Sequence, residues 1–144
     1  MKTVNYCVVA KINPADRESG EKKYYAVVQS KGQTGIDEIA ERISASTTAT
    51  RADVLAVLAA LEEQVIDNLE SGQTVKLGDI GSFRLSVGGE GAATEDTYDT
   101  SLIERVKVVF TPSSRMKAGL NSLKYTKVPI KNPKETDDEG GLGA

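Results

Sequence analysis

The sequence contains no histidine, no tryptophan and one cysteine, and aromatic residues make up only 5% of it. Without imidazole, zinc and iron sites lose their usual ligands and catalytic triads built on histidine are excluded. Magnesium chemistry by carboxylates alone is left open, but no spacing of acidic residues suggests it, so we expect no metal and no cofactor. Cys7 cannot form an internal disulfide, and its apolar surroundings favour a buried structural thiol over a reactive one.

Long apolar runs are also absent. No stretch approaches the roughly 20 apolar residues that a membrane helix needs, and the short, interrupted apolar stretch near the N-terminus makes a poor signal peptide. We therefore expect a cytoplasmic protein with no membrane contact. A length of 144 residues fits one domain with a modest core.

The net charge of −3 conceals a strong segregation along the chain. Residues 105–134 contain eight basic and no acidic side chains, whereas residues 34–72 contain two basic and eight acidic ones and residues 135–144 contain four acidic ones. Such a basic stretch can bind a phosphate backbone, but it is equally compatible with a solvated basic face beside an acidic helix. The charges alone leave both readings open.

The first third of the chain is predicted to form two strands. Residues 6–12 and 24–30 are rich in β-branched and aromatic residues, and the charged segment between them contains Pro14 and Gly20, so we expect a hairpin. Tyr24 and Tyr25 are then expected on opposite faces of one strand, with one of them buried.

Two helices are predicted next. Thr34 and Thr50 each stand three residues before an aspartate, as in a capping box. The second helix should reach Ser71, and its apolar stripe is wide: Val54, Val57, Leu58, Leu61, Val65, Ile66 and Leu69. One short neighbouring helix can hardly cover this stripe, which suggests dimerisation.

Three strands are predicted after the helices, over residues 74–77, 82–87 and 104–110. Between the last two lies a glycine-rich, acidic segment that is too long for a tight turn and is expected to form a mobile arm or loop. Pro112 and Ser113 should open a last helix over residues 113–125, with Met116, Leu120 and Leu123 buried. Residues 126–144 are predicted to be a disordered tail, and residues 132–144 contain no core-forming residue.

Two motifs in this order resemble the bacterial histone-like HU and integration host factor family. "VKLGDIGSFRL" is similar to the family's strand-turn-strand with G-x-G-[ST]-F, and "VVFTPSSRMK" is similar to its F-x-P-x-x-x-[LM]-[KR] element. The resemblance implies an α+β, HU-like domain over residues 34–125, with two helices, a three-stranded antiparallel sheet with a protruding arm, and a C-terminal helix. Residues 1–33 would form an extra N-terminal β-hairpin and residues 126–144 a tail. The hairpin and the acidic loop look most like the HU-related proteins of the Bacteroides group.

The resemblance also implies an intertwined homodimer and duplex DNA as a partner, in the nucleoid of the cytoplasm. Dimer-core positions match Ile80, Phe83 and Phe110. The DNA-binding candidates, on a saddle of strands and on the last helix, are Arg84, Arg105, Lys107, Arg115, Lys117 and Lys124. The arm departs from the family pattern, because residues 86–101 contain no lysine, arginine or proline and four carboxylates. We therefore expect weaker DNA bending than the family shows.

Two functions follow as hypotheses. The first is duplex DNA binding with little or no sequence preference, in a nucleoid-associated, architectural role. The alternative is a structural or protein-interaction module that keeps the HU fold, has lost DNA binding and holds a protein partner. Convergence of the basic side chains on one face would favour the first. We expect no enzyme, because Ser113 beside Ser114 and Lys117 is better explained as a helix N-cap than as a nucleophile.

Overall fold

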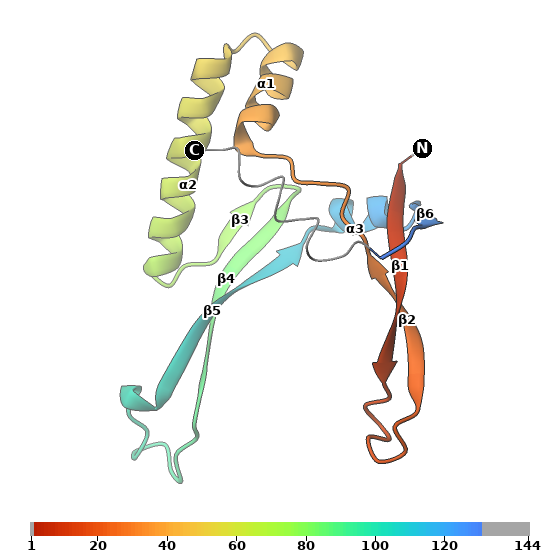
Figure 1. The fold of residues 1–144 in the computed structure, drawn as a ribbon. Helices are drawn as coiled ribbons and strands as arrows, with labels where there is room; N and C mark the ends of the chain where they lie inside the picture. The colour runs from red at the N-terminus through yellow and green to blue at the C-terminus, as the bar shows by residue number, and fades with distance from the viewer. Residues whose placement is uncertain (1, 131–144) are drawn as a thin grey trace, which may run out of the picture. The chain divides into compact units, whose positions relative to one another are not determined.

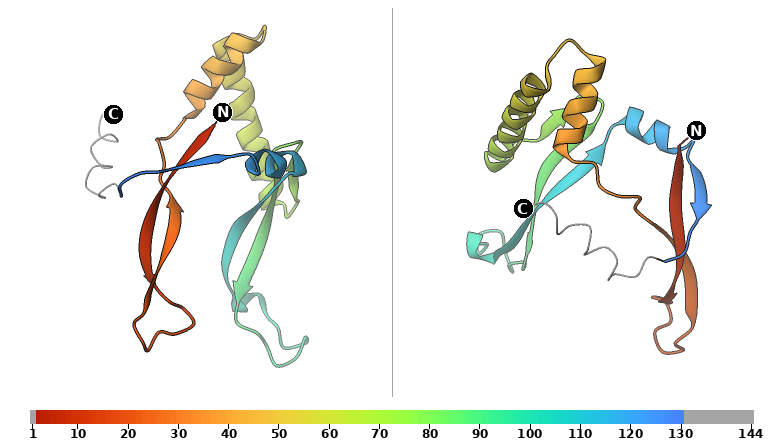
Figure 2. Two further views of the ribbon diagram at one scale, coloured as in Figure 1. Left: turned by 90° about the vertical axis from the view of Figure 1, so that its right-hand side faces the viewer. Right: turned by 45° about the horizontal axis from the view of Figure 1, so that its top comes forward.

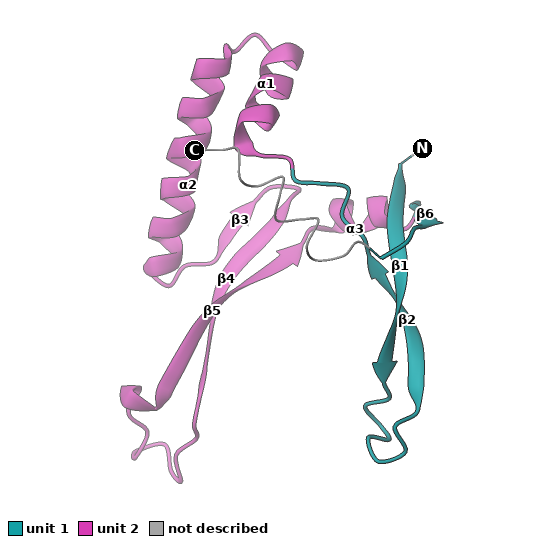
Figure 3. Cartoon of the chain, viewed as in Figure 1, with its two compact units in different colours: residues 1–33, 122–144 teal, residues 34–121 magenta. Residues whose placement is uncertain are grey.

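The computed structural model describes residues 2–130, which divide into two compact units (Figure 3). Of these residues, unit 1 contains 2–33 and 122–130, and unit 2 contains 34–121. The part of the predicted tail from residue 131 on, including the acidic residues 135–144, lies outside the described residues. The described residues form an α+β structure, as predicted, and contain no helix long and apolar enough to cross a membrane.

Unit 1 is a three-stranded sheet (Figure 1). Strands β1 (Thr3–Ile12) and β2 (Lys22–Val28) pair antiparallel, as expected, with Tyr6 opposite Val28 and Ile12 opposite Lys22. Strand β6 (Lys124–Lys127) pairs parallel with the other edge of β1, so the strand order is β2-β1-β6. The prediction of a separate N-terminal hairpin was therefore incomplete, because a strand from the far end of the described chain joins it.

Strand alternation divides the residues of unit 1 between two faces. Tyr24 lies opposite Ala10 and Tyr25 opposite Val9, so the two tyrosines lie on opposite faces, as predicted. The expectation that one of them is buried was wrong, because Tyr24 is 74% and Tyr25 40% exposed. Cys7 lies on the face of Tyr25, where it is a free, buried thiol with 4% of its surface exposed. This burial confirms the expected environment of Cys7.

Unit 2 begins with helices α1 (Ile36–Ser46) and α2 (Arg51–Glu70), which pack against each other. The capping box predicted for α2 is present, since the Thr50 side chain accepts from the Asp53 N–H and the Asp53 side chain accepts from the Thr50 N–H. The one predicted at Thr34 was wrong: α1 starts after Gly35, which has no side chain to cap it. An N-cap needs a side-chain oxygen one residue before the helix, and Thr34 is one residue too early.

The sheet of unit 2 has the order β3-β4-β5, with strands β3 (Val75–Leu77), β4 (Gly81–Gly89) and β5 (Ile103–Pro112), all antiparallel. Figure 2 shows β4 and β5 as a long hairpin whose far end is the predicted arm. The arm holds a short 3₁₀ turn, η1 (Thr100–Leu102), and the ladder slips by one residue after Gly88.

The last helix, α3 (Ser114–Leu120), is shorter than predicted. Ser113 caps it as expected, its side chain accepting from the Met116 N–H at 3.1 Å. The predicted helix over residues 113–125 was too long, because Gly119 weakens the helix and the β-forming residues after it pair with β1 instead.

Very little of the described chain is buried. The buried apolar residues are Cys7, Ala40, Val54 and Leu69. No large side chain of the described residues is fully buried. On the predicted stripe of α2, Val57, Leu61 and Ile66 are 68%, 40% and 56% exposed. Met116 and Leu120, expected to be buried, are 36% and 53% exposed. Residues 34–121 thus leave much of the apolar surface of unit 2 uncovered.

Candidate nucleic-acid interface

The turn between β3 and β4 is built around Gly81. Gly81 has φ +152°, and a β-carbon there would lie 2.3 Å from the Thr111 carbonyl oxygen and 2.7 Å from the Phe110 ring. Only glycine therefore lets β4 approach β5 so closely at this point. The ring of Phe110 lies next to that of Phe83, its partner in the ladder, with centroids 4.9 Å apart.

Successive side chains along each strand point to opposite sides of the β3-β4-β5 sheet, which therefore has two distinct faces. The apolar face carries Phe83, Leu85 and Val87, opposite Phe110, Val108 and Val106. The other face carries the polar residues of the same strands, and we call it the basic face: Lys76, Arg84, Arg105 and Lys107.

The four side chains of the basic face form a continuous row. Lys76 lies opposite Ser82 and so is diagonal to Arg84; Arg84 lies opposite Val109 and so is diagonal to Lys107. Arg105 follows two residues away on the same strand and face, at the base of the arm. All four residues are exposed, and the ladder places no carboxylate among them. The fold thus joins cations that are up to 31 positions apart in the sequence.

Arg105 lies against the strand beside it. A β-carbon at Gly88, its ladder partner, would meet the Arg105 Nε at 3.0 Å and its Cγ at 3.5 Å. Gly88 therefore leaves room for the arginine to cross the strand, which holds its guanidinium over the base of the arm.

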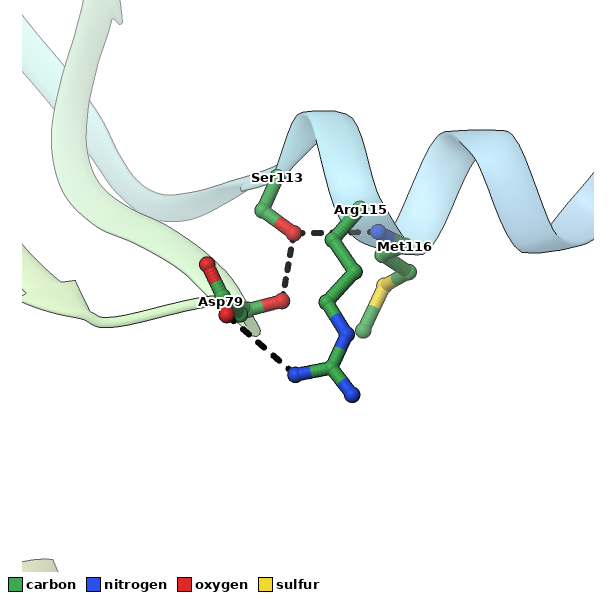
Figure 4. A network of polar contacts seen from close by, with 4 residues as sticks. All are labelled: Asp79, Ser113, Arg115 and Met116. Carbon is green, nitrogen blue, oxygen red and sulfur yellow. Dashed lines mark hydrogen bonds and ion pairs between the residues drawn. The ribbon is translucent and has the colours of Figure 1, made fainter.

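Arg115, another predicted DNA-binding residue, forms an ion pair (Figure 4). Its Nη1 lies 3.2 Å from Oδ2 of Asp79, in the β3-β4 turn, and both side chains are more than 70% exposed. The same aspartate accepts a hydrogen bond from the Ser113 hydroxyl through its backbone oxygen, and the Ser113 N–H donates to the Ile80 oxygen at 3.1 Å. The turn thus anchors the start of α3, and Asp79 offsets the charge of Arg115.

The other two candidates lie in different units. Lys117 is exposed on α3, in unit 2. Lys124, predicted on that helix, is instead in β6 of unit 1, together with Lys127. The basic segment 105–134 is therefore divided between two units, with Lys131 and Lys134 outside the described residues. Lys76 was missed by sequence reasoning, and only the strand register reveals it.

The arm carries negative charge around its end. Glu90, Glu95, Asp96 and Asp99 are all exposed there. Hydrogen bonds from Ser101, whose hydroxyl lies 2.6 Å from Oδ2 of Asp99, lower the pKa of that carboxyl below its usual value, so it is ionised at neutral pH. The arm offers no cation or proline to a phosphate backbone.

The predicted dimer-core residues lie at one end of the sheet. Ile80 and Phe110 are 51% and 41% exposed in the single chain, and Phe83 is half-buried. Phe83 and Phe110 belong to the apolar face, which is also exposed at Val87, Val106 and Val108. The dimer and its contacts stay a prediction.

Known proteins identify the fold. Residues 1–127 match the model of the HU-HIG family, described as an HU domain fused to wHTH, Ig, or glycine-rich motif. The chain belongs to this family. The match takes in β1, β2 and β6 as well as unit 2, so unit 1 is included in the family's pattern. No curated protein matches the chain.

Two solved structures are similar to this HU-HIG member. One is a candidate DNA-binding protein from Bacteroides vulgatus, with a TM-score of 0.62 and 13% identity over 93% of this chain. The chain spans about half of that protein, 52%. The other is a variant of HU from Thermotoga maritima, at 18% identity and a TM-score of 0.46, covering 60% of this chain and 99% of that one. Because 13% identity shows the fold alone, kinship with the Bacteroides proteins in particular stays a prediction.

Proposed function

We propose that this HU-HIG protein binds duplex DNA as a homodimer with little sequence preference, in an architectural, nucleoid-associated role. The observation that carries the proposal is the row of four cations on the basic face. Arginine and lysine side chains on an exposed strand face suit phosphate oxygens, which carry no direct sequence information. Members of the HU family bind DNA on such a strand saddle, which the sequence resemblance also implied.

The dimer is supported by the apolar surface that one chain leaves exposed. Exposed apolar residues occur on α2, in the β3-β4 turn and on the apolar face of the sheet, and patches larger than a few hundred Å² are unusual in monomers. Pairing two copies would cover Ile80, Phe83 and Phe110 and double the row of cations to eight.

The acidic arm sets the expected mode of binding. Carboxylates near a phosphate backbone repel it, and the arm has no apolar wedge of the kind that unstacks a base step. We therefore propose contact through the basic face and α3 without deep insertion into the minor groove. Equal affinity for linear and nicked duplexes is the expected result.

The test is fluorescence anisotropy of a labelled duplex of about 30 base pairs, a length long enough to cover a dimer, at several salt concentrations. If all eight cations of a dimer neutralise phosphates, log affinity should fall with log salt at a slope of about −7. Arg84→Ala and Arg105→Ala should each weaken binding and make that slope shallower by about 2, since each removes two contacts per dimer. Arg42→Ala is the matched control, because Arg42 pairs with Glu38 on α1, away from the basic face.

The alternative, a protein-interaction module that has lost DNA, is favoured by one observation. The described basic residues of segment 105–134 are divided between the two units: two are on β5 and two on α3 in unit 2, and two are on β6 in unit 1. This alternative predicts no duplex binding even at low salt while the fold is intact by circular dichroism. That result would overturn the DNA proposal and direct the search to a protein partner.

A further inference from the structure

One face of the unit 1 sheet carries three tyrosines, and we call it the tyrosine face. The ladder places Tyr125 opposite Val4 and Tyr24 opposite Ala10, on the same side as Tyr6. Tyr24 is 74% exposed and Tyr125 62% exposed, while Tyr6 is half-buried. Aromatic side chains this exposed on one sheet face are unusual unless a ligand or partner covers them.

Tyr6 and Tyr125 border a hollow. The rings of Tyr6 and Tyr125 meet edge to face, with centroids 6.5 Å apart and planes at 78°. Beside them lies an open hollow of about 420 Å³, completed by Ala26, Val27 and Val28. This volume is within the range of small-molecule sites, about 300–1,000 Å³, and its walls are aromatic and aliphatic.

The strands around this face are positively charged. Strands β1, β2 and β6 contain no aspartate or glutamate and five lysines, which are Lys11, Lys22, Lys23, Lys124 and Lys127. Lys22 lies opposite Ile12 and Lys127 opposite Tyr6, so both are on the tyrosine face. In the described part of unit 1 the carboxylates are confined to the β1-β2 connection, at Asp16, Glu18 and Glu21.

We propose that the tyrosine face binds single-stranded nucleic acid. Exposed aromatic rings stack on unpaired bases, and lysines beside them hold the backbone, which is how sheet surfaces bind single strands. Tyr125, opposite Val4, and Tyr24, opposite Ala10, mark the two ends of the row of tyrosines. Val4 and Ala10 are six residues apart along β1, or about 20 Å at roughly 3.3 Å per residue, and Tyr6 lies between them. The face therefore has room for a few nucleotides.

Charge and shape favour this occupant over others. A second copy of the same face would bring a further Lys22 and Lys127 against the first pair, and like charges repel. A duplex hides its bases in the stack and would leave the tyrosines unused. Single strands combine exposed bases with a negative backbone, and so match both features of the face.

The test uses the full-length protein and a fluorescein-labelled oligo-dT of about 20 nucleotides in an anisotropy titration at low salt. Tyr24→Ala and Tyr125→Ala should each weaken binding by about tenfold, since stacking contributes that order of affinity per base. Tyr24→Phe and Tyr125→Phe keep the stacking ring and should bind as the unaltered protein does. Tyr25→Ala is the matched control, because Tyr25 is the neighbouring residue on the opposite face.

Four results would overturn the proposal. The first is no binding of oligo-dT by the unaltered protein, and the second is equal loss in Tyr24→Ala and Tyr25→Ala. The third is a change of oligomeric state, seen by sedimentation velocity, in Tyr24→Ala without a change in oligo-dT affinity, which would make the face an interface between copies. The site is independent of the basic face, so the expected pattern includes Arg84→Ala/Arg105→Ala losing duplex binding while retaining oligo-dT. Loss of both ligands in that variant would also count against a separate site.

Discussion

Gly81 offers a direct test of how the β3-β4 turn holds unit 2 together. We predict that Gly81→Ala destabilises the protein severely. Two causes add: alanine at φ +152° is strained, and its β-carbon would lie 2.3 Å from the Thr111 oxygen and within 3 Å of the Phe110 ring. Neither neighbour can yield easily, because one is backbone and the other packs against Phe83.

The magnitude follows from these two contributions. A residue held in an unfavourable backbone region costs of order 1–3 kcal/mol. Forcing an extra carbon into a packed site costs a further 1–3 kcal/mol or so. Together the change removes about 2–6 kcal/mol from the free energy of unfolding, which is a large part of the 5–15 kcal/mol typical of a folded domain.

Gly78→Ala separates the two causes. Gly78 also has a positive φ, +48°, but a β-carbon there would meet nothing within 4 Å. It should therefore cost only the backbone strain, about 1–2 kcal/mol. Urea unfolding followed by far-UV circular dichroism measures both variants, at one protein concentration because the proposed dimer would make stability depend on it.

Equal destabilisation by Gly81→Ala and Gly78→Ala would refute the reasoning, since the steric contact would then contribute nothing. If Gly81→Ala does not fold at all, the reasoning still predicts that Gly81→Ser also fails to fold while Gly78→Ala folds. The near-UV signal of the aromatic residues should also change in Gly81→Ala, as the Phe110 ring is displaced.

Three further changes test other parts of the chain. Asp79→Asn frees Arg115 and should raise duplex affinity at low salt by no more than about fivefold, because exposed ion pairs are worth about 1 kcal/mol or less; lower affinity would contradict the idea that Asp79 competes with phosphate. Thr50→Ala should cost about 1 kcal/mol at pH 7 in thermal unfolding. Hydrogen bonds from Thr50 lower the pKa of Asp53, so the stability that ionised Asp53 contributes is present above its ordinary pKa of 3.8 and is lost as the pH falls through the lowered value. The difference in thermal stability between Thr50→Ala and the unaltered protein should therefore become smaller below pH 3.8. Cys7 should react with a thiol reagent only after urea is added, and rapid reaction of the native protein would show that the site opens.

The elements that local patterns mark were predictable from the sequence. Alternation of apolar and polar residues indicated β4, and Thr50 with Asp53 marked the start of α2. The predicted length of α3 was wrong because Leu123 continues the helical spacing of Met116 and Leu120, which extends the apparent helix. Nothing local shows that Tyr125 instead extends a sheet through β1.

The candidate interfaces were harder to predict because they depend on register. Lys76 stands alone in a three-residue strand, and only its diagonal place beside Arg84 makes it part of the basic face. The pairing of Arg115 with Asp79 joins residues that are 36 positions apart and was invisible for the same reason. Both cases show that charge counts along a segment do not reveal where those charges gather.

The pairing of β6 with β1 also has a consequence for how the chain is made. Thr3 pairs with Lys124, so unit 2 is inserted in the sequence between strands β2 and β6 of the unit 1 sheet. During synthesis, β1 and β2 leave the ribosome early but must wait for residues 124–127, whereas unit 2 is contiguous and can form beforehand. Folding unit 2 shortens the effective loop that unit 1 has to close, which lowers the entropic cost of that closure. A nascent chain stalled before Lys124 would lack the third strand of the tyrosine face, including Tyr125, so the proposed single-strand site can be completed only after unit 2 has been synthesised.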